Sequence, residues 1–284
     1  MTSTVAIGIS TRNRWEDLRS TLTKLAKFGL EDCPTFIIDD GSDVPCPFDR
    51  GSLSPQVQVT RFTESRGYIV RRNQLAQQMD AKYYLSLDDD SYPVAGSLDE
   101  ALAFAESHPD LLSLSFPIFN PVTREEQVRS LRKEPYKVRS FVGCAHLLNR
   151  MRFLDLGGYR EELIHQGEEV ELSARAFQQQ LYCYHYPGFQ FHHTESDTGR
   201  NKHRIDYYGT RNNVLWNDWF VPPRSKLIKQ SRTLLSSAAL FVRTGRVDLA
   251  KGQIAGFKDA AKYRNYRQPM SAMLYEKWKG LPAH

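Results

Sequence analysis

Short apolar runs alternate with longer segments of helical periodicity along the first 116 residues of the chain. Runs rich in β-branched residues predict buried strands, whereas apolar side chains three and four positions apart predict helices that bury one face. The strands are predicted over 5–10, 35–39, 57–62, 82–87 and 111–116, and the helices over 13–29, 68–79 and 97–108. This alternation predicts an α/β fold, in which a mostly parallel sheet carries helices on both faces.

The pattern changes beyond residue 120. Residues 120–140 are charged and include two prolines, so we expect a long loop or an irregular hairpin there. Residues 167–181 predict a helix with acidic side chains in its first turn, where the helix dipole favours them, and residues 182–193 predict one strand. The later sequence predicts two or three basic helices. Its apolar run over 233–242 is too short to span a bilayer.

The composition is typical of a globular protein with a sizeable core, because 40% of the 284 residues are hydrophobic and 25% are charged. The first residues have neither the basic start nor the apolar run of a signal peptide, and no apolar run approaches the ~18 residues that cross a membrane. We therefore expect a cytoplasmic protein. The four cysteines are scattered without a CxxC pair, which predicts free thiols.

The charge is unevenly distributed along the chain. Residues 201–284 carry 16 Lys and Arg against 5 Asp and Glu, whereas residues 1–200 carry 22 against 28. A basic C-terminal region beside an acidic body predicts contact with an anionic partner, for which phospholipid headgroups, a phosphorylated acceptor and nucleic acid all qualify. The alternative is a basic helical face that is exposed to water or packed on the body.

Three adjacent carboxylates, Asp88, Asp89 and Asp90, follow the predicted strand 82–87. Side chains alternate along an extended chain, so Asp88 and Asp90 can face one side while Asp89 faces the other. In open α/β sheets, ligands bind beyond the carboxyl ends of the strands. Two carboxylates on one side predict a Mg²⁺ or Mn²⁺ ion that is shared with substrate phosphates. The alternative is an acidic turn exposed to water.

Other polar groups accompany these acids. Asp39 and Asp40 end a neighbouring strand, where a carboxylate could bind a nucleobase or a ribose, or could form an Asx-turn. Glu169 lies among acids before a helix and could be a general base, or could simply complement the helix dipole. His192 and His193 end a strand and could ligate a metal or be structural. Motifs of serine hydrolases, P-loop enzymes, zinc proteases and dinucleotide-binding dehydrogenases are absent.

Taken in order, these motifs resemble those of the family 2 glycosyltransferases, whose GT-A fold is a Rossmann-like α/β fold. The matching segments lie within roughly residues 4–196 and are "VAIGISTRNRW", "FIIDDGSD", "RRNQL", "YLSLDDDSYP", "LGGYREEL", "GEEVELSAR" and "FHH". The resemblance implies an inverting transfer of a sugar, hexosyl or deoxyhexosyl, from a nucleotide-diphosphate donor of the UDP or dTDP type to an acceptor hydroxyl. It also implies Mn²⁺ or Mg²⁺ as cofactor and a place in polysaccharide or glycoconjugate assembly.

The resemblance further implies roles for individual residues. Glu169 matches the catalytic base, which is usually Asp in the family, and Asp90 matches the metal ligand. One of His192 and His193 matches a further ligand of the metal or the diphosphate, and His192 is preferred. The donor-binding positions are matched by Ser10, Thr11, Arg12, Asn13, Asp39, Asp40, Arg66, Gly67, Asn73, Asp88 and Asp89. Arg72 is a second candidate, beside Arg66, for placing positive charge near the donor phosphates.

We therefore expect a catalytic domain over residues 1–200, followed by a basic helical extension over 201–284. The catalytic domain divides into a nucleotide-sugar half of about 1–92 and an acceptor half of about 93–200. The expected partners are the donor and a carbohydrate or lipid-linked acceptor. The extension is a candidate for peripheral contact with an anionic membrane, and no nucleic-acid partner is expected.

Two other classes of protein share these features. A nucleotidyltransferase that makes sugar nucleotides has a related sheet and metal, but it is expected to carry a Gly-rich, basic loop after the first strand, and "GISTRNRW" is poor in Gly. A non-catalytic module that binds sugar nucleotides or carbohydrate would keep the acids of a donor site without turnover.

Overall fold

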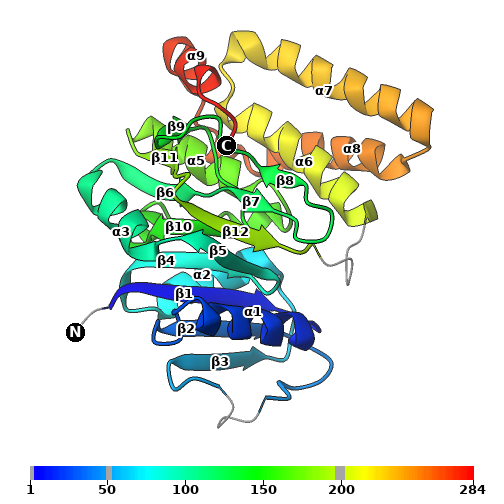
Figure 1. Cartoon of the computed structure of the whole chain (residues 1–284). Helices are drawn as coiled ribbons and strands as arrows, with labels where there is room; N and C mark the ends of the chain where they lie inside the picture. The colour runs from blue at the N-terminus through cyan, green and yellow to red at the C-terminus, as the bar shows by residue number, and fades with distance from the viewer. Residues whose placement is uncertain (1–2, 49–52, 196–201) are drawn as a thin grey trace.

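The computed structural model describes residues 3–48, 53–195 and 202–284 and contains two sheets (Figure 1). The larger sheet has the strand order β3-β2-β1-β4-β10-β6-β11-β9. Its strands are β1 (Ser3–Thr11), β2 (Thr35–Asp40), β3 (Val57–Phe62), β4 (Ala81–Asp88), β6 (Leu111–Ser115), β9 (Tyr136–Val138), β10 (Ala145–Asn149) and β11 (Tyr182–His185). The smaller sheet has the order β5-β12-β7-β8, from β5 (Ser91–Gly96), β7 (Ile118–Phe119), β8 (Glu126–Val128) and β12 (Phe189–His193).

The register of the parallel strands brings the sequence motifs to one edge. Ser10 of β1 lies beside Asp88 of β4, and Thr11 lies beside Asp39 of β2. The strands β1, β2, β3 and β4 are all parallel, so their carboxyl ends meet at the same side of the sheet. This is the edge at which an α/β sheet of this kind binds ligands.

Helices cover both faces of the larger sheet (Figure 1). On one face α1 (Trp15–Lys27) and α3 (Leu98–Ser107) pack on strand residues such as Ile7 and Leu85. On the other face α2 (Tyr68–Gln78), α4 (Arg150–Asp155) and α5 (Glu168–Gln178) pack on residues such as Ala6 and Tyr84. Neighbouring strand residues thus enter opposite cores, as the two-residue period of a strand requires. The predicted α/β fold with helices on both faces is confirmed.

Residues 182–193 do not form the single strand that the sequence predicted. They form β11 and β12, which belong to different sheets and are separated by a turn that includes Pro187 and Gly188. The turn passes close to Gly96 of β5, where a Cβ would lie 1.9 Å from the carbonyl oxygen of Gly188. Within the segment 120–140, β8 pairs antiparallel with β7, which ends just before the segment at Phe119, so the expected irregular hairpin begins two residues earlier.

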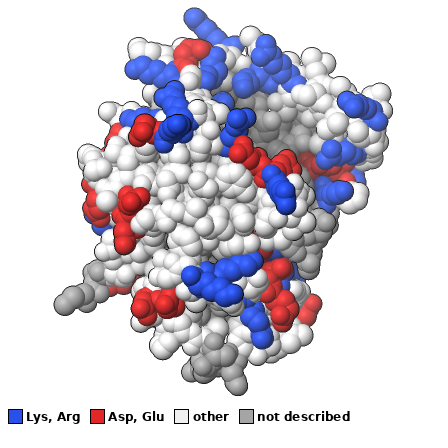
Figure 2. All heavy atoms as spheres, viewed as in Figure 1, with Lys and Arg blue, Asp and Glu red and all other residues white. Residues whose placement is uncertain are grey.

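The C-terminal region is helical. It contains α6 (Lys202–Phe220), α7 (Pro223–Thr244), α8 (Val247–Lys262), a short 3₁₀ turn (Arg264–Tyr266) and α9 (Ala272–Gly280). Lys and Arg side chains gather over the end of the molecule where α7 and α9 lie (Figure 2). Across the described ranges, no helix combines the length and hydropathy that crossing a bilayer requires. The predicted boundary between residues 200 and 201 lies outside the described residues.

The helix α6 attaches this region to the body. Leu215, Trp219 and Phe220 are fully buried in the core that also contains α5. Arg211 donates a hydrogen bond of 2.9 Å to the carbonyl oxygen of Glu162 and pairs with Asp259 of α8 at 2.6 Å. The extension is therefore packed on the body through α6, while α8 packs in turn on α6.

Candidate active site

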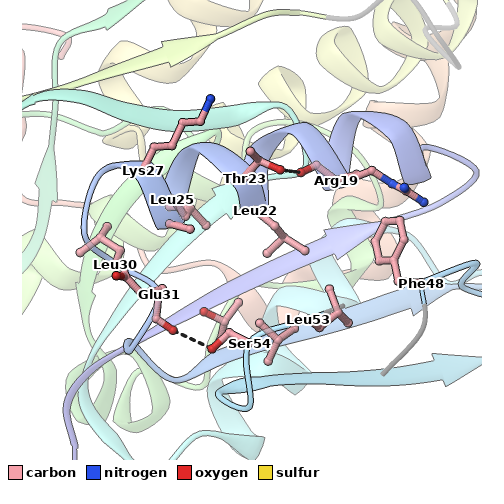
Figure 3. A pocket seen from close by; sticks show the side chains of 13 residues that line it. Arg19, Leu22, Thr23, Leu25, Lys27, Leu30, Glu31, Phe48, Leu53 and Ser54 are labelled. Atoms are coloured by element: carbon pink, nitrogen blue, oxygen red, sulfur yellow. Dashed lines mark hydrogen bonds between the residues drawn. The ribbon is translucent and has the colours of Figure 1, made fainter. Parts of the chain in front are cut away.

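A cavity of about 460 Å³ lies between α1 and the segment that leads to β3, away from the strand-end acids (Figure 3). Its lining includes Leu22, Leu25, Leu30, Phe48 and Leu53, and none of the predicted site residues lines it. The candidate functional groups gather instead at the carboxyl end of β4.

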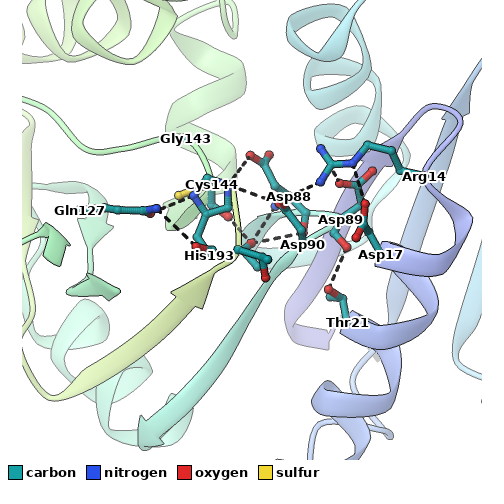
Figure 4. A network of polar contacts seen from close by, with 12 residues as sticks. Arg14, Asp17, Thr21, Asp88, Asp89, Asp90, Gln127, Gly143, Cys144 and His193 are labelled. Atoms are coloured by element: carbon teal, nitrogen blue, oxygen red, sulfur yellow. Dashed lines mark hydrogen bonds and ion pairs between the residues drawn. The ribbon is translucent and has the colours of Figure 1, made fainter. Parts of the chain in front are cut away.

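Asp88, Asp90 and His193 form a compact cluster there (Figure 4). One ligand atom from each of the three side chains lies within 4.8 Å of the others. His193 Nε2 is 3.3 Å from Asp90 Oδ1 and 3.9 Å from Asp88 Oδ2. Two carboxylates and an imidazole are ligands that Mn²⁺ accepts, so this cluster could hold a divalent cation. The predicted alternation, with Asp88 and Asp90 on one side, is confirmed.

His193, and not the preferred His192, is the histidine of this cluster. Side chains alternate along β12, and His192 packs its ring edge-to-face on Tyr92, with the centroids 5.6 Å apart. His193 Nδ1 lies 2.9 Å from Gln127 Oε1, a contact that orients the imidazole toward the acids. Burial alone would lower the pKa of His193, but its contacts with Asp90 and Cys144 raise that pKa to about 11.

Asp89 points away from the cluster and anchors the neighbouring elements. Thr11 Oγ1 donates a hydrogen bond of 2.7 Å to Asp89 Oδ2, and Thr21 of α1 donates one of 2.8 Å to the carbonyl oxygen of Asp89. Burial raises the pKa of the Asp89 carboxyl to about 7, against the opposing effect of Arg14. These contacts give Asp89 and Thr11 a structural role at the end of β4, and the donor-binding roles that the resemblance implied stay predictions.

Arg14 is a residue of this site that the sequence reading missed. Its Nη2 lies 2.6 Å from Asp90 Oδ2, its Nη1 lies 3.3 Å from Asp89 Oδ1, and its Nε bonds Asp17 at 3.1 Å. The guanidinium therefore offsets part of the repulsion within the acidic triplet (Figure 4). The crowding of three adjacent carboxylates was the available signal, since such a triplet needs nearby cations.

Arg72 connects the acidic cluster to the glutamates of α5. Its Nη2 bonds Asp88 Oδ1 at 2.6 Å and the carbonyl oxygen of Gly143 at 2.8 Å, and its Nη1 lies 3.3 Å from Glu168 Oε1. The guanidinium is almost fully buried and stacks over Tyr68 at 4.7 Å. The β4 strand end and the start of α5 therefore share one cation and face one site.

Glu169 lies on the same side. A Cβ on Gly143 would come 2.4 Å from Glu169 Oε1 and 2.7 Å from Arg72 Nη1, so a side chain at residue 143 would force the glutamate or the arginine to shift. Burial raises the pKa of both Glu168 and Glu169, and Arg72 partly offsets the effect. A carboxyl with a raised pKa that lies beside a candidate metal site is suited to accept a proton.

Asp40 and Asn73, two other predicted donor-binding residues, are occupied by contacts within the protein. Asp40 accepts hydrogen bonds from Ser65 Oγ, the amides of Arg66 and Gly67, and Arg71 Nε, at distances of 2.5–2.8 Å. Burial would raise the pKa of Asp40, but these bonds lower it. Asn73 exchanges two hydrogen bonds of 2.8 Å with the backbone of Tyr159. Both residues therefore shape the walls of the site.

The remaining predicted residues lie around the same edge. Asp39 is fully buried and accepts from the Ser42 amide at 2.8 Å. Arg12 is exposed and donates to Ser65 Oγ at 3.1 Å, whereas Asn13 bonds Asp43 across the edge. Ser10 is half-buried, Arg66 pairs with Glu161 at 3.2 Å, and Gly67 precedes α2 with a φ of 88°.

Comparisons with known proteins show the family and the fold of the chain. A family model described as glycosyl transferase family 2 matches residues 6–160, more than half of the chain. A search of curated proteins gave no match. Among solved structures, GalNAc-T7 with UDP, GalNAc and Mn²⁺ is 17% identical with a TM-score of 0.57, over 76% of this chain and 51% of that one. The present chain thus spans about half the length of GalNAc-T7.

Two further structures are similar over more of their length. The mannosyltransferase PcManGT from Pyrobaculum calidifontis, with GDP-Man and Mn²⁺, is 13% identical, with a TM-score of 0.57 over 98% of this chain and 79% of that one. TarS 1–349 from S. aureus, with UDP-GlcNAc, is 15% identical, with a TM-score of 0.57 over 80% of this chain and 69% of that one. At these identities the likeness shows the fold alone.

Proposed function

Because the chain belongs to glycosyl transferase family 2 and has the GT-A fold, we propose that it moves a sugar from a nucleotide-diphosphate donor to an acceptor hydroxyl with inversion. The observation that carries this proposal is the bridge formed by Arg72. It joins Asp88, a member of the candidate metal cluster, to the start of α5, where Glu169 lies. A donor phosphate site and a proton acceptor would then border one space.

We propose that Asp88, Asp90 and His193 hold a divalent cation, Mn²⁺ or Mg²⁺. Their ligand atoms lie within 4.8 Å of one another, so small side-chain rotations would bring all three to the ~2.1 Å bonds that such cations make to oxygen. When bound, the cation would neutralise the charge that grows on the leaving nucleotide diphosphate. Arg14 supplies a fixed positive charge on the other side of Asp90 and keeps that carboxylate in place.

Glu169 is the proposed general base. It would accept the proton of the acceptor hydroxyl while that oxygen attacks the anomeric carbon from the face opposite the diphosphate, and this single displacement inverts the carbon. Its raised pKa supports the role, because a base acts best when its pKa approaches the working pH. Arg72 and Tyr68 contact Glu168 and would fix the position of the neighbouring Glu169.

The donor nucleotide, of the UDP or dTDP type, would lie over the carboxyl ends of β1 and β2. Arg12 and Ser10 retain exposed surface at this edge and are the better candidates for direct contact. Asp39, Asp40 and Asn73 would act by holding the surrounding loops. The donor would thus use residues of about 1–92, and a carbohydrate or lipid-linked acceptor would use residues of about 93–200. We also propose that the extension over 201–284 contacts an anionic membrane.

The products formed from nucleotide sugars in the presence of Mn²⁺ test this function. We expect slow hydrolysis that releases the nucleoside diphosphate and the free sugar when no acceptor is supplied. Pyrophosphate formation would indicate a nucleotidyltransferase instead. Donor binding without any turnover, even with a panel of acceptors, would indicate a binding module. A thermal-shift screen selects the donor first, because a ligand that binds only the folded state raises its melting temperature.

A further inference from the structure

The helix α7 turns its apolar side chains away from the protein. Within the described part of the chain, none of its 22 residues is buried. Its large apolar side chains are exposed by fractions that range from 39% for Phe241 to 83% for Val242. These side chains, here called the α7 apolar face, are Leu227, Ile228, Leu234, Leu235, Phe241 and Val242.

The spacing places these six side chains on one side of the helix. Leu227, Leu234 and Phe241 are seven residues apart, and each is followed by a second apolar residue of the α7 apolar face. Seven residues are close to two turns, so the side chains form two adjacent rows. The half-buried side of α7 is more polar, and Thr233 Oγ1 accepts a hydrogen bond of 3.3 Å from Asn217 of α6. The helix is amphipathic, but its apolar side faces outward.

Positive charge surrounds the α7 apolar face. Residues 219–247 contain six Lys and Arg and no Asp or Glu. Lys229 is half-buried and lies near Arg139, Lys279 and Arg232, and burial together with these cations lowers its pKa. Lys and Arg side chains gather at this end of the molecule (Figure 2). A cluster of like charges beside exposed apolar surface is a combination that an anionic, partly apolar partner would stabilise.

We propose that α7 lies in the interface of an anionic lipid bilayer, with the α7 apolar face inserted among the acyl chains and the flanking Lys and Arg on headgroup phosphates. An interfacial helix has these properties: an apolar face of Leu and Phe, cationic flanks, and insufficient hydropathy to span. Because this membrane contact is part of the proposed function, it would place a lipid-linked acceptor on the same surface as the enzyme. Lipid binding itself needs no glycosyl transfer.

A second copy of the chain is a less suitable occupant of the same surface. Pairing two α7 helices would bring Arg224, Arg232 and Arg243 close to the same cations of the other copy, and α7 contributes no carboxylate to compensate. The α7 apolar face is also two rows wide, whereas a coiled-coil seam needs only the narrower a and d stripe.

Flotation with lipid vesicles tests this assignment. The full-length protein is mixed at low salt with vesicles of phosphatidylcholine alone or of equal parts phosphatidylcholine and phosphatidylglycerol, without any donor. We expect binding to the anionic vesicles only. The double variant Leu234→Gln/Leu235→Gln should lower the partition coefficient at least about tenfold, because two inserted side chains are lost. The variant Arg232→Gln/Arg243→Gln should lower it roughly fivefold for each cation removed.

The matched control is Val122→Gln/Met151→Gln, which removes two apolar side chains that are 75% and 53% exposed elsewhere. It should bind vesicles like the unchanged protein. No binding of the unchanged protein to anionic vesicles, or equal loss in the control, would overturn the assignment. Light scattering measures the oligomeric state of the unchanged protein and of the variants. If the unchanged protein is a dimer and Leu234→Gln/Leu235→Gln is a monomer, a second copy of the chain occupies the α7 apolar face and the assignment is overturned. Calorimetry with the donor on each variant reports on the donor site alone, so a failure of lipid binding can be distinguished from a failure of the proposed activity.

Discussion

The guanidinium of Arg72 lies 2.6 Å from Asp88 Oδ1, and this contact joins the candidate metal site to the region of the proposed base. Through its other terminal nitrogen the same side chain reaches Glu168, which is fully buried. The candidate metal site and the start of α5 would act on opposite sides of the anomeric carbon, and both thus contact the same buried cation. The geometry of the site therefore depends on that cation.

Replacing Arg72 should therefore damage both stability and activity. Arg72→Gln leaves buried carboxyls without their cation, and we expect a loss of about 3 kcal/mol in the free energy of unfolding, measured by urea denaturation. Arg72→Lys keeps the charge but not the forked geometry, so its free energy of unfolding should lie between those of the unchanged protein and Arg72→Gln. The control is Arg66→Gln, which removes an exposed arginine and should cost less than about 1 kcal/mol. Equal stability of Arg72→Gln and Arg66→Gln would contradict the bridging role.

Gly143→Ala should disturb the base while leaving the fold intact. The added Cβ would meet Glu169 Oε1 at 2.4 Å, so the carboxylate or Arg72 must shift. A displacement of this size in a catalytic group should lower kcat about 100-fold. The control is Gly280→Ala, whose Cβ would meet no atom within 4 Å. If steady-state kinetics gave the same kcat for both variants, Glu169 would not be placed as critically as the structure indicates.

His193→Ala should weaken binding of Mn²⁺, whereas His192→Ala should leave it unchanged. Only His193 shares the cluster with Asp88 and Asp90, and His192 packs on Tyr92. We expect the dissociation constant for Mn²⁺, measured by titration calorimetry with the nucleoside diphosphate present, to rise about 10- to 100-fold in His193→Ala. The opposite ranking of the two variants would restore the sequence-based preference for His192.

Asp40→Asn should destabilise the protein in a pH-dependent way. Asp40 is paired with the buried Arg71, and losing the negative charge should cost about 3 kcal/mol at pH 7. The folded state lowers the pKa of Asp40, so its contribution is complete above the unfolded value of about 3.9 and is lost as the pH falls through the folded value. Urea denaturation of both proteins across pH should show the difference shrinking only below about pH 4. A difference that is constant down to strongly acidic pH would contradict this origin.

Much of the fold follows from local patterns in the sequence. The buried strands, the helices with one apolar stripe and the strand ends that carry Ser10, Asp39 and Asp88 could be located, because two- and 3.6-residue periods are local properties. The alternation of Asp88 and Asp90 could be predicted for the same reason. The division of 182–193 into two strands could not, since it depends on which sheet each half joins.

Contacts between distant segments explain what the sequence could not provide. Arg14 looks like an ordinary helical residue, and Arg72 could be predicted only as a candidate near the donor phosphates. Only the folded chain brings the two arginines to acids 16 to 96 positions away. The sequence also could not show that four donors from the loop before α2 and from α2 bind the carboxylate of Asp40, whose contact with the donor stays a prediction. The sequence could not show which of the two histidines faces the acids, because this depends on the pairing of β12. That strand lies antiparallel to β5 and places His193 opposite Ser91.

The variant Glu169→Gln tests whether Glu169 is the general base. Gln keeps the shape of the side chain but cannot accept the acceptor proton. Calorimetry with the donor and Mn²⁺ should give an unchanged dissociation constant, while the rate of sugar transfer or donor hydrolysis should fall about 100- to 10,000-fold. A Glu169→Gln protein that binds the donor and turns over at the original rate would show that Glu169 is not the general base.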